Sequence, residues 1–129
     1  MRRAILAGVL TLTAVVGLAA PITTFNATPP TNYEDGTVIP VTDVLSYAIY
    51  CGTTSGGPYN LVQAGLPNLT DAPVDVGSCV TQPGTYFFVA TASSTDFGTE
   101  SQFSGEVAKV YTASELGKVP VAPVLISVQ

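Results

Sequence analysis

The sequence contains no histidine and no tryptophan, and only two cysteines and one methionine among its 129 residues. Without histidine, catalytic pairs of serine or cysteine with histidine are excluded, and so are imidazole metal sites. Four basic residues stand against nine acidic ones, which gives a formal net charge of −5. A phosphate-binding surface needs clustered lysine and arginine. We therefore expect no binding to nucleic acid or to an anionic membrane surface.

The composition predicts an ordered chain of short strands. Hydrophobic residues make up 47% of the sequence and charged residues only 10%, which excludes a disordered segment. The 12 glycines and 10 prolines break the apolar runs into short pieces. This pattern favours strands joined by turns over long helices, and the length suffices for one domain.

The N-terminus is typical of an export signal. Met1-Arg2-Arg3 is positively charged, the stretch from Ala4 to Val16 is apolar, and Gly17-Leu18-Ala19 is a small-x-small cleavage site. We expect residues 1–19 to be removed after Ala19, and no later stretch is long enough for a membrane span. The alternative, which stays open, is a retained segment that serves as an anchor or as a buried strand.

Cys51 and Cys79 are predicted to form a disulfide, because an even cysteine count in an exported chain favours pairing. Closing the loop between residues 51 and 79 stabilises the fold by about 3.5 kcal/mol in the chain-entropy model. Two buried free thiols are the alternative.

Six segments have strand composition, and turn signals separate them. In the segment 45–51, the alternate positions Tyr47, Ile49 and Cys51 face one side. The segment 85–92 is apolar on both faces, as a central strand would be. The six predicted strands are 22–25, 45–51, 59–64, 74–80, 85–92 and 105–112.

Four sequence blocks, in this order and at this spacing, resemble bacterial and phage fibronectin type III domains. The blocks are Asn32-Tyr-Glu-Asp-Gly36, Ser46-Tyr-Ala-Ile-Tyr-Cys-Gly-Thr53, Pro83-Gly-Thr-Tyr-Phe-Phe-Val-Ala-Thr-Ala92, and Gly98-Thr-Glu-Ser101 followed by Phe103-Ser104 and Glu106-Val107. The resemblance implies an all-β, immunoglobulin-like sandwich of two sheets, which we assign to residues 20–112.

The resemblance also implies roles for core residues. Tyr86 takes the place of the tyrosine-corner residue, whose hydroxyl bonds to backbone, and Phe88 follows it inward. Phe25 lies near the place of the family's core tryptophan, and Cys51 and Cys79 would join the two sheets. The expected core comprises Phe25, Tyr47, Ile49, Tyr86 and Phe88.

The family's first strand is missing from a chain that starts after Ala19, and residues 113–129 form a linker and an extra C-terminal strand that resembles it. The expected assembly residues are Val121, Val124, Leu125, Ile126 and Val128. Four interpretations stay open: this strand pairs with the next molecule, it pairs within its own domain, the tail is disordered, or a retained N-terminal segment fills the vacant edge.

We expect no catalytic residues, no cofactor and no metal site, because the acidic pairs lie in predicted loops. The leading hypothesis is a non-catalytic structural or adhesive module outside the cytoplasm that associates with itself or with other surface proteins. The second is a phage virion protein, a decoration or tail component, with the N-terminal segment retained. The third is an accessory carbohydrate-binding module whose candidate ligand-contact aromatics are Tyr33, Tyr59 and Phe97.

Overall fold

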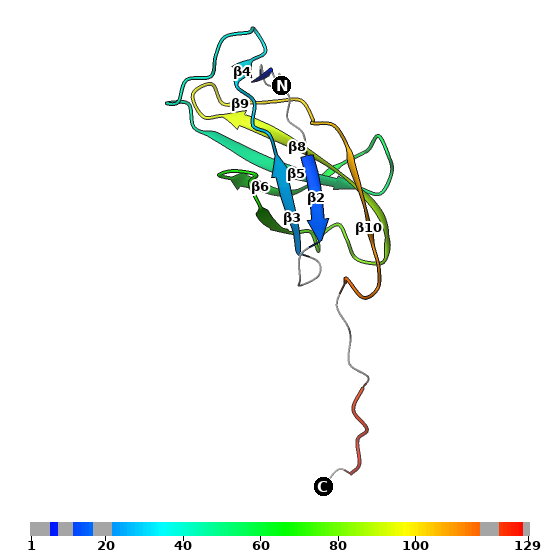
Figure 1. The fold of residues 1–129 in the computed structure, drawn as a ribbon. Helices are drawn as coiled ribbons and strands as arrows, with labels where there is room; N and C mark the ends of the chain where they lie inside the picture. Colours follow the sequence, from blue (N-terminus) through cyan, green and yellow to red (C-terminus); the bar gives the residue numbers. More distant parts are fainter. Residues whose placement is uncertain (1–5, 8–11, 17–21, 117–121, 128–129) are drawn as a thin grey trace.

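The computed structural model describes residues 6–7, 12–16, 22–116 and 122–127, which form a β-sandwich (Figure 1). All of the regular elements in these residues are β-strands. The described part of the chain thus contains no helix long and apolar enough to cross a membrane.

The larger sheet has the strand order β10-β8-β5-β6, and a short strand β9 also pairs with β8. Its neighbouring strands are all antiparallel. The strands are β5 (Leu45–Gly52), β6 (Asn60–Leu66), β8 (Gly84–Ser94), β9 (Thr99–Glu100) and β10 (Val107–Tyr111).

The second sheet has the order β2-β3-β7, again antiparallel. Its strands are β2 (Leu12–Val16), β3 (Ile22–Ala27) and β7 (Ala72–Asp75). A separate short ladder joins β1 (Leu6–Ala7) to β4 (Asn32–Tyr33) at the pole where the N-terminus lies (Figure 1).

The core lies between the sheets, and the alternation along β5 and β8 explains it. The register pairs Tyr47 with Ala92, Ile49 with Ala90 and Cys51 with Phe88, so these side chains share the inner face. All five predicted core residues are buried: Phe25, Tyr47, Ile49, Tyr86 and Phe88. The Tyr86 hydroxyl donates to the Gln82 carbonyl at 2.8 Å, the backbone bond that the resemblance implied.

The predicted disulfide is present. Cys51 in β5 is bonded to Cys79, which follows β7 in the chain, with a Cα–Cα distance of 6.3 Å. The bond therefore joins the larger sheet to the segment that leaves the smaller one. The predicted strand 74–80 is shorter than expected, because Asp75 accepts a hydrogen bond from the Gly77 N–H and turns the chain.

The position of the first strand differs from the prediction. Leu12–Val16, which the sequence analysis assigned to the export signal, forms β2 and pairs with β3 along all five residues. In the full chain, the N-terminal segment therefore fills the edge of β3. This is the last of the four interpretations. The physical reason is that an apolar run of export composition also satisfies a sheet edge.

The C-terminal segment is not a strand of its own domain. Residues 122–127 have no regular structure and are exposed. They point away from the pole where β10 ends (Figure 1). Of the interpretations left open, pairing within the same domain does not occur in residues 122–127, and β2 holds the place beside β3.

Candidate functional site at the β3 edge

The β3 edge, defined as the side of Thr23–Ala27 that faces β2, is covered by the N-terminal strand. The register pairs Leu12 with Ala27, Ala14 with Phe25 and Val16 with Thr23. Leu12 is only 4% exposed, so β2 contributes to the core as well as to the ladder.

One backbone hydrogen bond of β3 shows which of its N–H groups face β2. Ala27 donates its N–H to the Leu69 carbonyl at 2.8 Å, on the β7 side. Because successive N–H groups along a strand point to opposite sides, Asn26 and Thr24 present theirs to β2. An occupant of the edge must therefore offer backbone groups opposite these two residues.

The floor of the edge consists of Phe25, Thr23 and Tyr111. It is mostly apolar and contains one polar contact. Phe25 is fully buried and meets Phe88 edge-to-face at 5.2 Å between ring centroids. The Thr23 and Tyr111 hydroxyls lie 2.6 Å apart, and this hydrogen bond joins β3 to the end of β10. Burial raises the pKa of Tyr111, so its phenol stays protonated. β2 also contacts β10, and so it closes the open side between the sheets (Figure 1).

The C-terminal segment, residues 122–127, carries apolar side chains that are almost wholly in solvent. Val124 is 86% exposed, Leu125 79% and Ile126 92%. Three adjacent apolar residues are seldom exposed on a protein surface unless they contact a partner. The other two predicted assembly residues, Val121 and Val128, lie outside the described residues.

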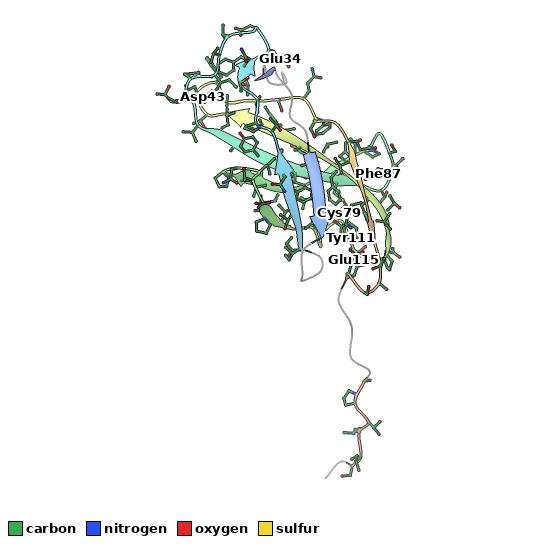
Figure 2. The ribbon with its side chains drawn as sticks, viewed as in Figure 1. Glu34, Asp43, Cys79, Phe87, Tyr111 and Glu115 are labelled. Atoms are coloured by element: carbon green, nitrogen blue, oxygen red, sulfur yellow. A yellow bond between two sulfur atoms is a disulfide. The ribbon has the colours of Figure 1, made fainter. Side chains whose placement is uncertain are left out.

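The opposite pole is fixed by a buried carboxylate that the sequence analysis missed. Asp43, which is 4% exposed, accepts hydrogen bonds from the Tyr33 hydroxyl at 2.5 Å, the Ser94 hydroxyl at 2.6 Å and the Asp96 N–H at 3.0 Å. We call these groups the Asp43 cluster. Figure 2 shows Asp43 at this pole and Tyr111 near the other. The only sequence signal for Asp43 is its place just before a strong strand.

The Asp43 cluster also explains two pKa shifts. Burial pushes the pKa of Asp43 up, but hydrogen bonds from Ser94, Tyr33 and backbone N–H groups outweigh it and hold that pKa below its ordinary value. Burial and the adjacent Asp43 carboxylate raise the pKa of Tyr33 to about 12. The cluster holds an ionised acid and a neutral phenol, an arrangement that fixes the loops between β3 and β5 and after β8.

Of the three candidate ligand-contact aromatics, Tyr33 and Phe97 lie together and Tyr59 does not join them. Tyr33 is buried because its hydroxyl reaches Asp43, and its ring meets Phe97 edge-to-face at 5.4 Å. Phe97 is 59% exposed. Tyr59 lies elsewhere, half-buried against Phe103, and its hydroxyl donates to Glu106. No shared aromatic platform for a sugar results.

No cluster of three or more metal-ligating side chains occurs in the part of the chain that the structure describes. A cleft of about 320 Å³ lies beside the disulfide, with only uncharged residues around it. Its lining is Cys51, Gly52, Thr53, Pro58, Asn60, Leu61, Val62, Ser78 and Cys79.

Comparison with solved structures identifies a similar fold. The chain is similar to the crystal structure of an Fn3-like protein from Clostridium thermocellum, with 23% sequence identity and a TM-score of 0.57. The match covers 81% of this chain and 91% of that chain. Comparisons with protein-family models and with curated proteins gave no match. The fold is thus an Fn3-like, immunoglobulin-type sandwich of two sheets.

Proposed function

We propose that this protein is a non-catalytic structural module outside the cytoplasm. It self-associates head to tail through residues 122–127, which we call the donor segment. The observation that carries the proposal is the exposure of Val124, Leu125 and Ile126, beyond the end of a sandwich whose own strands leave them unpaired. Burying three such side chains against a partner is favourable by about 1.5 to 3 kcal/mol each before ordering costs.

The location outside the cytoplasm is supported by two features. The Cys51–Cys79 disulfide is typical of an oxidising compartment. Arg2 and Arg3 precede an apolar run and a small-x-small site, the order of an export signal. The acidic surface and the lack of clustered lysine and arginine favour protein partners over nucleic acid.

The test is sedimentation velocity on material exported from a bacterial host. The wild type should sediment as oligomers, and deletion of residues 119–129 should give monomers. The double change Val124→Asp and Ile126→Asp should do the same, because it places charge where burial is required. Ser127→Asp, one residue further along, is the matched control and should still associate. Equal oligomerisation of the truncated and complete chains would overturn the proposal.

A second candidate is favoured by β2 itself. The burial of Leu12 and the full pairing of β2 with β3 suit a chain that keeps its N-terminus, as in a phage virion protein such as a decoration or tail component. The intact mass of native material separates the two functions. A chain that starts at Ala20 supports the exported module, and a chain that retains Met1 supports the virion protein.

A further inference from the structure

We propose that β2 and the donor segment of a second copy compete for the same position on β3, so that residues 1–19 block self-association until they are removed. This inference rests on the proposed function and adds its acceptor site, its strand register and its control. The acceptor is the β3 edge, and the occupant is residues 124–128 of a second copy of this chain.

The direction of the chain favours a second copy over the same molecule. β2 enters from the β4 pole and runs antiparallel to β3 (Figure 1). The donor segment leaves from the opposite pole, so its own return to β3 from there would be parallel. A neighbouring molecule placed end to end receives the donor at its β4 pole and therefore antiparallel, as β2 is now. The 13 residues from 112 to 124 span up to about 40 Å, enough to enter the neighbour.

The backbone bonds of the edge select a register. Placing Val124 opposite Ala27 puts Ile126 opposite Phe25 and Val128 opposite Thr23, so three β-branched side chains face the core. The residues opposite Asn26 and Thr24 are then Leu125 and Ser127, which both have the N–H group that the ladder needs. Pro123, which has none, falls before the first paired residue.

The neighbouring register is less favourable. A shift by one residue turns Val124 and Ile126 to solvent and points Ser127 toward the buried floor. The floor consists of Phe25, Thr23 and Tyr111, whose two hydroxyls already bond to each other, so a serine there would bury a further polar group in place of an apolar side chain. The register that turns Val124, Ile126 and Val128 toward the core is therefore favoured.

The same residues carry both the export features and the occupying strand. β2 is the end of the apolar run, and the small-x-small site at 17–19 follows it directly. Cleavage after Ala19 removes β2, exposes the N–H and C=O groups of Asn26 and Thr24, and uncovers Phe25. Because an exposed edge recruits a strand, the processed chain becomes an acceptor at the moment it loses its own first strand.

The test uses the full chain with a specific protease site in place of residues 17–20. Before cutting, the chain should be monomeric by sedimentation velocity and should not bind a fluorescent peptide of residues 119–129. After cutting and release of the N-terminal piece, it should form oligomers and bind the peptide. The cut chain without residues 119–129 should stay monomeric yet still bind the peptide. The Cys51–Cys79 disulfide keeps the larger sheet joined to the segment after β7 during the experiment.

A second variant covers the case in which the cut chain does not stay folded. Leu12→Asp in the uncut chain places a charge at a position that is 4% exposed, so it should loosen β2 and permit peptide binding. Leu12→Met, which conserves volume, should not. If uncut and cut chains bind the peptide and associate equally, the competition is wrong and self-association through the tail stands. If no form binds the peptide or associates, the proposed function itself fails.

The register has its own test in the processed chain. Ser127→Cys combined with Thr24→Cys should give intermolecular disulfide-linked dimers and higher species on mild oxidation. Leu125→Cys combined with Thr24→Cys is two residues out of register and should link far less. Equal linking in both pairs would overturn the register.

Discussion

Two regions of this sandwich, a framework of strands and the β3 edge, are held together by different kinds of bond. The framework, β5 and β8 with the loops at the β4 pole, is locked by side chains: the Cys51–Cys79 disulfide and the Asp43 cluster. The edge is closed by one backbone ladder to β2, over a floor that a single hydrogen bond between Thr23 and Tyr111 completes. Nothing in the framework's locks involves β2.

Because of this difference, we expect the stability of the fold and the exchange of its edge strand to depend on different residues. Side-chain locks depend on particular residues and hold whichever strand fills the edge. The bonds of a backbone ladder do not depend on side-chain identity, so the edge can accept any strand that has the right direction, N–H groups and apolar side chains toward the floor. The framework is therefore expected to decide stability, and the edge is expected to decide association.

The largest effect should come from breaking the framework. Phe88→Ala removes a fully buried ring between Phe25 and Tyr111, so the free energy of unfolding should fall by about 4 kcal/mol. Urea titration of the full chain measures this. Ile126→Asp, on a side chain in solvent, should change the same quantity by less than about 0.5 kcal/mol but abolish association of the processed chain. A comparable loss of monomer stability in both variants would break the comparison.

The sequence predicted the strands β5 and β8 of the framework and its disulfide, because their signals are local. Alternating apolar residues along 45–51 and 85–92 define the inner face, and the paired cysteines lie on it or beside it. The placement of Phe25 and of the Tyr86 hydroxyl needed the family resemblance in addition. These features depend on one segment at a time, so they can be seen without knowing which strands are neighbours.

The edge and the Asp43 cluster could not be predicted in this way. Leu12–Val16 has the composition of both an export signal and a strand, and only the proximity of β3 decides for the strand in the full chain. Tyr33 looked like a surface aromatic because its partner, Asp43, is ten residues away and its ring contact, Phe97, is on another loop. Long-range partners of this kind leave no periodic pattern.

A smaller effect, and one that depends on pH, should follow from Asp43→Asn. At neutral pH the amide replaces a carboxylate that accepts three hydrogen bonds, so stability should fall by about 2 kcal/mol. Because the pKa of Asp43 is lowered in the folded state, the wild-type advantage is complete above its unfolded value of 3.8 and is lost as the pH falls through the folded value. Urea titrations at neutral pH and below about pH 3 measure the difference.

The gap between wild type and Asp43→Asn should therefore shrink in acid. Asp35→Asn is the surface comparison: its exposed carboxylate accepts hydrogen bonds from the Thr37 N–H and hydroxyl, which also lower its pKa, so its gap should change with pH in the same direction but by less. Self-association of the processed Asp43→Asn chain should be unchanged, because the cluster lies in the framework. A gap that is constant with pH would mean that the ionised form of Asp43 is not what the cluster stabilises.

The smallest effect should come from the floor of the edge. Tyr111→Phe leaves the buried Thr23 hydroxyl without its partner, so stability should fall by about 1 kcal/mol. The loss should be local: amide hydrogen exchange of Thr24 and Asn26 in the full chain should quicken, because β3 is no longer tied to β10. Tyr86→Phe, which removes the bond to the Gln82 carbonyl in the framework, is the control with a similar cost. If Tyr86→Phe quickens exchange along β3 as much as Tyr111→Phe does, the edge is not a separate unit, since loosening the framework would then open it equally well.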